Sequence, residues 1–261
     1  MLILGIDTSQ SLVSLAILSE ERLWAEYSFF SSKTQLKRLI PTLKKVLEDA
    51  GLTVRELEGI AISLGPGSFT GLRLGLATAK GLAQGLNIPL VGIPSLDVLA
   101  RNLLFAQDLI CPILDARRKE VYTAIYRSKM SDARCQGTEQ PVGVPLGTII
   151  SKTEDGRQKA EPHLKKLTSD LVISPEKLIE QLENYKEKVI FLGNGLIPYG
   201  EKITKGLKKR ALFAPANLWS LQASNLAYLG LKRLKEGDVD DLFTLKPKYV
   251  RRWGEQAPNH K

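Results

Sequence analysis

The strongest constraint on the fold is a strand pattern that occurs twice along the chain. Leu2–Asp7 is a short apolar stretch that ends in an aspartate, which is typical of a buried strand. Strand-like stretches at Ser11–Leu18 and Leu23–Phe29 follow with only turn residues between them, so we expect three antiparallel strands. Leu109–Asp115 repeats this opening, and Glu120–Arg127 alternates like its return strand. The pattern predicts an α/β protein with two related halves that face a cleft.

Helical periodicity follows the strands in each half. Apolar residues from Leu36 to Ala50 recur with the spacing i, i+3, i+4, i+7, which predicts an amphipathic helix. A short strand at Gly59–Ser63, a glycine-rich loop and a helix from about Gly71 to Leu86 come next. The second half is expected to contain, in order, an irregular region at 128–170, a helix at 174–182, a strand at 188–193 and a helix at 218–235.

Composition excludes several classes of protein. The 261 residues are 43% hydrophobic and 25% charged, which is ordinary for a soluble globular chain. No apolar run approaches the ~18–20 residues of a membrane span, so we expect a cytoplasmic protein without a membrane partner. Two cysteines without a CxxC pair, and two histidines without an HExxH or HxxxH spacing, predict no disulfide framework, no metal site and no histidine-based catalysis.

The positive charge lies in the later part of the chain. Residues 1–100 contain 9 basic and 9 acidic side chains, so the remainder carries the whole net charge of +9. Within 200–261, 13 basic and 6 acidic residues give +7. Cations alternate with aromatic rings near the end, which suits contact with single-stranded RNA through Lys248, Tyr249, Arg251 and Arg252. The alternative is a basic tail whose aromatic side chains pack within the chain.

The most specific stretch is Gly65–Gly75, with the sequence GPGSFTGLRLG. It lies between a predicted strand and a predicted helix, where backbone N–H groups favour an anion. It matches neither the P-loop nor the dinucleotide fingerprint, so a tight turn is the alternative. The next helix has Gly71, Gly75, Ala79 and Ala83 on one face. Because each interior glycine costs ~1 kcal/mol relative to alanine, we expect a second backbone, from this chain or another subunit, to approach closely there.

A candidate nucleotide site is spread over both halves. Actin-like ATPases and sugar kinases place an aspartate at each of the two matching hairpins, for magnesium and phosphate. The glycines usual in the first turn are absent here, so the site is expected to be vestigial, and the aspartates can equally cap turns. The Gly-Asn-Gly turn after a predicted strand can seat an adenosine or only turn the chain. The candidate residues are Asp7, Thr8, Ser9, Asp115, Gly193, Asn194 and Gly195.

A set of short motifs resembles one protein family. In chain order they are Leu4–Ser9, Arg38–Pro41, Gly65–Arg73, Pro94–Leu96, Asp115–Arg117 and Pro247–Arg251. The set is similar to the TsaB family, the non-catalytic small subunits of the bacterial machinery for tRNA threonylcarbamoyladenosine synthesis. The resemblance covers most of residues 1–127 and returns at 247–251, and the GPGSFTGLR run is its specific part.

The resemblance implies an actin-like fold with an N-terminal half at 1–105, a C-terminal half at 106–245 and a basic tail at 246–261. It also implies pairing with the catalytic relative TsaD and the ATPase TsaE, which act on the adenosine beside the anticodon in ANN-decoding tRNAs, and a homodimer when the chain is alone. ATP or ADP is expected only at the interface of that complex. The family's contact surface maps to Leu36, Leu39, Ile40, Leu43, Gly67, Ser68, Phe69, Thr70, Gly71, Arg73, Leu74, Gly75, Thr78, Ala79 and Leu82.

Two other function classes remain open from the sequence. One is a small-molecule kinase or ATPase of the actin-like fold, which magnesium-dependent ATP turnover by the isolated chain would favour. The other is an RNA-binding protein that acts through its basic C-terminus, which tight binding of tRNA by the chain alone would favour. The missing histidine pair argues against the protease activity once assigned to such sequences.

Overall fold

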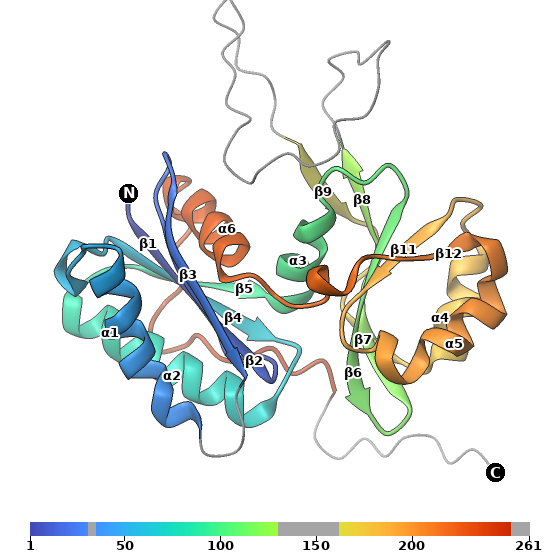
Figure 1. Ribbon diagram of the computed structural model, residues 1–261, viewed down its shortest axis with the longest axis horizontal. Coiled ribbons are helices and arrows are strands. Elements are labelled where there is room, and N and C mark those ends of the chain that lie inside the picture. Colours follow the sequence, from blue (N-terminus) through green and yellow to red (C-terminus); the bar gives the residue numbers. More distant parts are fainter. Residues whose placement is uncertain (31–34, 130–161, 252–261) are drawn as a thin grey trace, which may run out of the picture.

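The computed structural model describes residues 1–30, 35–129 and 162–251, which form two sheets with helices packed on them (Figure 1). The first part of the chain forms β1 (Ile3–Asp7), β2 (Leu12–Leu18), β3 (Leu23–Phe30), η1 (Gln35–Arg38), α1 (Leu39–Asp49), η2 (Val54–Glu56), β4 (Gly59–Gly65), α2 (Phe69–Leu86), β5 (Leu90–Pro94), α3 (Ser95–Ala100) and η3 (Arg101–Leu103). The second part forms β6 (Leu109–Arg117), β7 (Glu120–Thr123), β8 (Tyr126–Lys129), β9 (His163–Lys166), β10 (Leu171–Ile173), α4 (Pro175–Glu183), β11 (Val189–Leu192), α5 (Leu196–Leu207), η4 (Lys208–Arg210), β12 (Ala211–Phe213), η5 (Ala216–Leu218) and α6 (Ala223–Lys235).

Both sheets have the same strand order. The first runs β3-β2-β1-β4-β5 and the second β10-β7-β6-β11-β12, with β8 paired to β6 and β9 paired to β8. In each sheet the central strand, β1 or β6, pairs antiparallel with the strand that follows it and parallel with the strand on its other side. This duplicated order confirms the prediction of an actin-like α/β fold with two related halves.

Local signals in the sequence place most of the elements. Thr53 and Glu56 form a capping box at the start of η2, and Ser174 caps α4 with Pro175 at its first position. The predicted return strand at 120–127 is split into β7 and β8, and α5 and β12 have no predicted counterpart. The final helix begins at Ala223 and not at Leu218, because a 3-10 turn precedes it. Among the described residues, no helix is both long and apolar enough to span a bilayer.

Helices cover both faces of the first sheet. On one face, α1 and α2 bury Leu39, Val46 and Ala79 against Leu4 and Ile6. On the other face lies α6, which follows the second half in the sequence but packs on β1, β2 and β4 (Figure 1). The chain therefore returns to the first half after completing the second sheet. The predicted C-terminal half, residues 106–245, includes α6. In the structure α6 packs on the first sheet instead.

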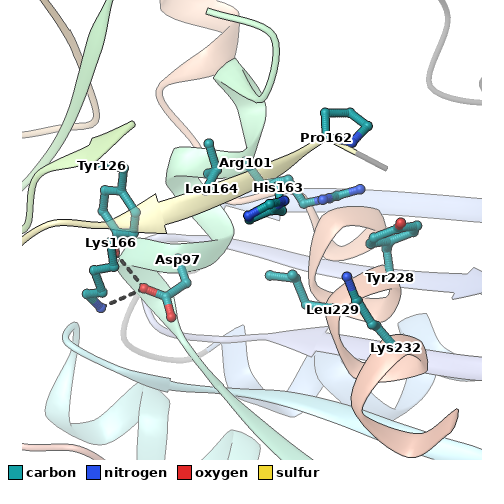
Figure 2. A pocket seen from close by; sticks show the side chains of 10 residues that line it. All are labelled: Asp97, Arg101, Tyr126, Pro162, His163, Leu164, Lys166, Tyr228, Leu229 and Lys232. Atoms are coloured by element: carbon teal, nitrogen blue, oxygen red, sulfur yellow. Dashed lines mark hydrogen bonds and ion pairs between the residues drawn. The ribbon is translucent and has the colours of Figure 1, made fainter. Parts of the chain in front are cut away.

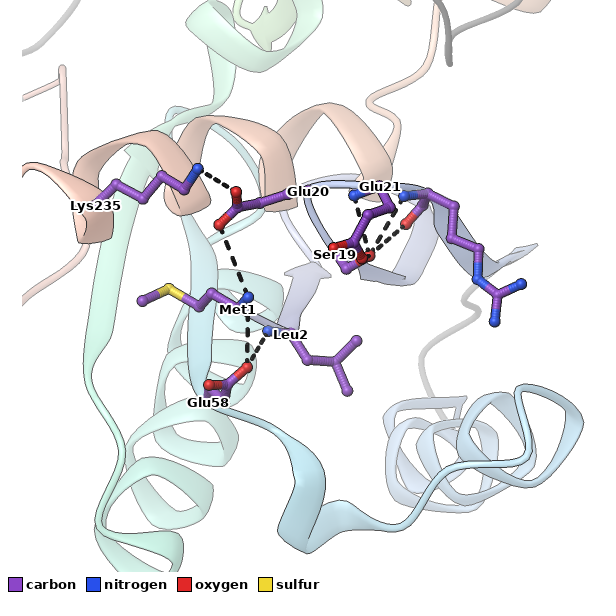
Figure 3. A network of polar contacts seen from close by, with 8 residues as sticks. Met1, Leu2, Ser19, Glu20, Glu21, Glu58 and Lys235 are labelled. Atoms are coloured by element: carbon purple, nitrogen blue, oxygen red, sulfur yellow. Dashed lines mark hydrogen bonds and ion pairs between the residues drawn. The ribbon is translucent and has the colours of Figure 1, made fainter.

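The end of α6 is also fixed by polar contacts (Figure 3). Lys235 Nζ lies 2.6 Å from Glu20 Oε2 in the β2–β3 turn, and Glu20 Oε1 lies 3.8 Å from the N-terminal ammonium group of Met1. Exposed ion pairs of this kind contribute only ~0–1 kcal/mol. The apolar face of α6, which includes the fully buried Leu226, therefore supplies most of the attachment.

The small residues of α2 pack inside the chain. Gly71, Gly75, Ala79 and Ala83 are all buried. A Cβ at Gly71 would lie 2.1 Å from the Thr8 carbonyl oxygen, and one at Gly75 would lie 2.0 Å from Thr8 Oγ1. The prediction of a closely approaching backbone is confirmed. The expectation that this stripe faces another subunit is wrong, because the end of β1 and the turn after it occupy the space.

A second set of small residues lies on the outer face of α2. Ala77, Gly81 and Gly85 are exposed and recur every four residues. A Cβ at Gly81 or Gly85 would meet nothing within 4 Å. These three outward-facing residues therefore lie on a different face of α2 from the stripe that begins at Gly71, which the sequence pattern singled out.

The two stripes respond differently to an added methyl group. We expect Gly75→Ala to lower the free energy of unfolding by ~1–3 kcal/mol, because its Cβ would overlap Thr8 in a packed region. The matched change Gly81→Ala should raise it by up to ~1 kcal/mol, since only helix propensity changes there. Urea unfolding of both variants measures the difference. Equal effects at the two positions would contradict the internal packing of the first stripe.

Candidate functional site

The glycine-rich loop before α2 lies against the β1–β2 turn. The Ser68 amide donates to the Ser9 carbonyl oxygen at 2.6 Å, and Ser68 Oγ accepts from the Gly71 amide at 3.3 Å as the cap of α2. A Cβ at Gly67 would lie 2.2 Å from the Ser9 carbonyl oxygen. Two amides at the helix start are therefore used within the chain, which supports the tight-turn interpretation of this loop over an anion site.

The first candidate hairpin is closed. Asp7, Thr8 and Ser9 are each at most 1% exposed. Asp7 Oδ1 accepts a hydrogen bond from the Ser9 amide at 3.0 Å and another from Ser63 Oγ, and Thr8 Oγ1 donates to the Gly71 carbonyl oxygen at 2.8 Å. Burial raises the pKa of the Asp7 carboxyl, and the hydrogen bonds from Ser63 and Ser9 only partly oppose that shift. Because burial disfavours the charged carboxylate and closes the hairpin to solvent, Asp7 is poorly placed to bind magnesium.

The second candidate hairpin is open and meets the Gly-Asn-Gly turn. Asp115 is exposed, and its amide donates to Asn194 Oδ1 at 2.9 Å. Asn194 Nδ2 lies 3.5 Å from Gln10 Oε1 of the first half. A Cβ at Gly193 would lie 2.2 Å from a β6 carbonyl oxygen, and the Gly195 amide donates to the same oxygen at 3.0 Å. The structure thus brings Asn194 between both hairpins, and a nucleotide role for these residues stays a prediction.

Cys111 and His163 are the cysteine and the histidine that the described residues contain. Cys111 is buried in β6, and burial raises the pKa of its thiol to about 12, far from the reactive thiolate. His163 is exposed on β9, while Cys135 and His260 lie outside the described residues. Within residues 1–30, 35–129 and 162–251, no three His, Cys, Asp or Glu side chains are grouped to hold a metal ion.

The predicted partner residues divide by burial. Exposed are Ile40, Ser68, Phe69, Thr70, Arg73 and Leu74. Half-buried are Gly67, Thr78 and Leu82. Buried within this chain are Leu39, Leu43, Gly71, Gly75 and Ala79, and the Leu36 side chain lies outside the described part. The buried members cannot reach a partner in this conformation, because they pack against the first sheet or the turn after β1, so any contact falls to the exposed and half-buried members.

A segment that includes the start of the predicted basic tail connects the two halves. We call residues 240–251 the C-terminal strap. In the first half, the Lys248 amide donates to the Leu64 carbonyl oxygen at 2.8 Å. In the second half, Lys248 Nζ lies 2.6 Å from Asp170 Oδ2, and Arg251 pairs with Glu120. The strap therefore joins β4 to the β6–β7 hairpin and to the segment before β10.

The aromatic residue of the strap packs at the start of α2. The Tyr249 ring centroid lies 5.5 Å from that of Phe69, and Arg73 Nε donates to the Tyr249 hydroxyl at 3.0 Å. The Arg73 guanidinium lies 3.7 Å from the Phe69 ring centroid. Three of the four predicted RNA-binding residues, Lys248, Tyr249 and Arg251, thus have partners inside the chain, and Arg252 lies outside the described part. Their contact with RNA stays a prediction.

The raised pKa of the Asp7 carboxyl predicts that the stability of the protein depends on pH. Folding raises the pKa of this carboxyl, so its contribution to stability is fully present below the unfolded pKa of 3.8 and is lost as the pH rises through the raised folded pKa. Asp7→Asn keeps an acceptor for Ser63 and Ser9 but carries no charge. We expect its advantage over the parent in free energy of unfolding to be smallest below about pH 4 and to grow as the pH rises through the folded pKa of Asp7, by at most ~1.4 kcal/mol per pH unit. Urea unfolding at a series of pH values measures this difference. A difference that does not vary with pH would contradict this.

The ion pair between Lys248 of the strap and the buried Asp170 is expected to stabilise the fold. Asp170 is 1% exposed and Lys248 is 50% exposed, so Lys248→Gln removes one of the two cations beside a buried carboxylate. We expect the free energy of unfolding to fall by ~1–2 kcal/mol, because Lys166 still pairs with Asp170. Lys246→Gln, at an exposed position two residues earlier, is the control and should change little. Chemical denaturation measures both, and equal losses would refute the role of the pair.

Comparison with known proteins agrees with these motifs and this fold. Residues 30–254 match the family model described as TsaD, tRNA N6-adenosine threonylcarbamoyltransferase. The tRNA threonylcarbamoyladenosine biosynthesis protein TsaB of Bacillus subtilis (strain 168) is 32% identical over 254 residues, which cover 96% of this chain and 94% of that protein. The protein of the same name from Haemophilus influenzae is 27% identical over 92% of each chain.

One solved structure supports the fold. A Pseudomonas aeruginosa protein, described as uncharacterized with similarity to peptidase YEAZ, superposes with a TM-score of 0.72 over 96% of this chain and 99% of its own. Its 23% sequence identity supports the fold alone. The family follows from the sequence matches over almost the whole length. The chain belongs to the TsaB family of tRNA threonylcarbamoyladenosine biosynthesis proteins.

Proposed function

We propose that this chain is the non-catalytic subunit of a tRNA threonylcarbamoyladenosine synthesis complex. In this role it binds and activates a TsaD-type catalytic subunit, together with a TsaE-type ATPase, in the cytoplasm. The observation that carries the proposal is the uncovered apolar surface of α1 and α2. In this proposal the complex modifies the adenosine beside the anticodon in ANN-decoding tRNAs. This chain contacts tRNA only as part of that complex.

The exposed surface has the character of a protein interface. Ile40 on α1 is 54% exposed, and Phe69 and Leu74 on α2 are 41% and 38% exposed. The two helices lie on the same face of the first sheet (Figure 1). The open positions Gly81 and Gly85 on α2 let another helix approach closely. Exposed apolar patches mark contact sites on soluble proteins, and we propose that these three side chains belong to one such patch. The same surface would serve the homodimer of the isolated chain.

The closed first hairpin supports a subunit without catalysis. Asp7 is buried under the loop that precedes α2, and the Cys111 thiol is inaccessible. These features disfavour the alternative of a small-molecule kinase or ATPase, which needs an ionised aspartate open to magnesium and nucleotide. The chain needs no cofactor of its own in this proposal. Any ATP or ADP would lie at the interface with the catalytic subunit.

A pair of substitutions on the outer face of α2 tests the proposal. Leu74→Arg and Gly81→Leu should each weaken capture of the TsaD-type subunit by ~2 kcal/mol or more, about 30-fold, because a charge or a bulky group then enters the interface. The Tm of Gly81→Leu should be at least that of the parent, since its side chain meets open space. Size-exclusion chromatography with light scattering measures capture and dimerisation.

The control is a matched change at another exposed apolar residue. Ile197→Arg, on α5 of the second half, alters a residue that is 78% exposed and should leave capture unchanged. Threonylcarbamoyladenosine formation by the reconstituted complex should fall in Leu74→Arg and Gly81→Leu, which lose capture. It should stay at the level of the parent in Ile197→Arg. If Leu74→Arg and Gly81→Leu bind the catalytic subunit as the parent does, the interface lies elsewhere. Robust ATP turnover by the chain alone would favour the kinase alternative.

A further inference from the structure

The turn of the β6–β7 hairpin consists of three basic residues in a row. Arg117 ends β6, and Arg118 and Lys119 link it to Glu120, the first residue of β7. All three basic residues are exposed, and the turn lies at the lower edge of the view in Figure 1. No apolar residue stands among them. A row of exposed cations of this kind indicates an anionic partner.

The backbone of this turn is unusual for the residues that it contains. The φ angles of Arg117, Arg118 and Lys119 are 59°, 53° and 61°, in the left-handed region that favours glycine and asparagine. Arg117 pairs with Glu120, so two residues connect the strands. A two-residue connection with positive φ at both positions is the type I′ pattern, for which Asn-Gly is the preferred sequence. The chain keeps two cations there at a cost in stability, and backbone strain of this kind is typical of functional sites.

The acidic residues beside the turn have contacts within the chain. Glu120 pairs with Arg251 of the strap. Asp115 Oδ1 accepts a hydrogen bond from the Arg117 amide at 2.8 Å. With Arg251 included, four basic side chains stand against these two carboxylates at this end of the hairpin. The end of the hairpin therefore carries a net positive charge.

The cations of the strap are already engaged in holding the halves together. Lys248 Nζ lies 2.6 Å from the buried Asp170, which also contacts Lys166. Lys166 in turn pairs with Asp97, as Figure 2 shows. Because Lys248 and Arg251 both have acidic partners, the cations of the turn are better placed than those of the strap to contact a further molecule.

The turn borders the surface that we propose for the catalytic subunit. Tyr249 of the strap packs on Phe69 at the start of α2, and Arg251, two residues later, pairs with Glu120 at the base of the turn. Two residues of extended chain span at most ~7 Å. An RNA held by the complex beside this interface would therefore lie within reach of the turn.

We propose that the β6–β7 turn contacts the phosphate backbone of the tRNA through Arg117, Arg118 and Lys119. A guanidinium binds two phosphate oxygens at once, and an ammonium group adds a point charge. An acidic protein partner is less favoured, because the centres of protein interfaces are apolar and depleted in lysine. The inference rests on the proposed function, since the chain meets tRNA within the complex.

The double substitution Arg118→Asn/Lys119→Gly, the turn variant, separates charge from folding. It gives the turn its preferred sequence, so the Tm should rise by ~2–4 °C. It also removes two cations, so the reconstituted complex should bind an ANN-decoding tRNA about tenfold more weakly at about 0.15 M salt. The slope of log affinity against log salt should become shallower by ~1.5, because two phosphate contacts are lost. Fluorescence anisotropy of labelled tRNA over a salt series measures both effects.

Two control variants show whether the position of the charge matters. Lys119→Arg keeps the charge of the turn and should bind tRNA as the parent does. Lys186→Gln/Lys209→Gln removes two exposed charges that precede β11 and β12. Since both strands run parallel to β6, these lysines lie at the opposite end of the sheet from the turn. This double control should leave tRNA binding unchanged.

Light scattering of each complex measures capture of the catalytic subunit in the same samples. The proposal is overturned if the turn variant, with normal capture, binds tRNA with the affinity and salt slope of the parent, or if the double control loses as much. Loss of capture in the turn variant would assign the turn to a protein contact and overturn it equally. If the parent itself fails to capture the catalytic subunit, the proposed function fails, and this inference fails with it.

Discussion

The close packing of the β1–β2 turn on the start of α2 is the contact on which the rest of the first half depends. Thr8 reaches the helix backbone because positions 71 and 75 carry no side chain, and its hydroxyl donates to the Gly71 carbonyl oxygen. This contact buries Asp7, which removes the first hairpin from the cleft. It also fixes which face of α2 turns outward. The burial of the first-hairpin aspartate and the outward face of α2, which we propose to bind a partner, therefore have one structural cause.

A second constraint is that two segments from the end of the chain hold the halves together. Helix α6 leaves the second sheet and covers the inner face of the first. The C-terminal strap then runs past the start of α2 and pairs with Asp170 and Glu120 of the second half. Because the strap packs Tyr249 on Phe69 and Arg73, it borders the surface proposed for the partner. Changes in the strap and changes in that surface are thus expected to be coupled.

Several features could be predicted because they depend on neighbours in the sequence. The strands up to β6 have consecutive apolar residues and turn residues between them, and the capping box at Thr53 is a contact over three residues. The weakly patterned second half was harder: α5 and β12 were not predicted, and the return strand was expected to be continuous. The role of the strap was missed as well, since Lys248 and Asp170 lie far apart in the chain and their pairing has no local signal.

The sequence by itself determined the duplicated α/β architecture and the family, because both depend on local periodicity and on the short GPGSFTGLR run. It also indicated that a second backbone must approach the small residues of α2. Only the tertiary structure decided that this backbone is Thr8 of the same chain and that Ala77, Gly81 and Gly85 face outward. The physical reason is that four-residue spacing places residues on one face of a helix, while the packing of distant segments decides which face is covered.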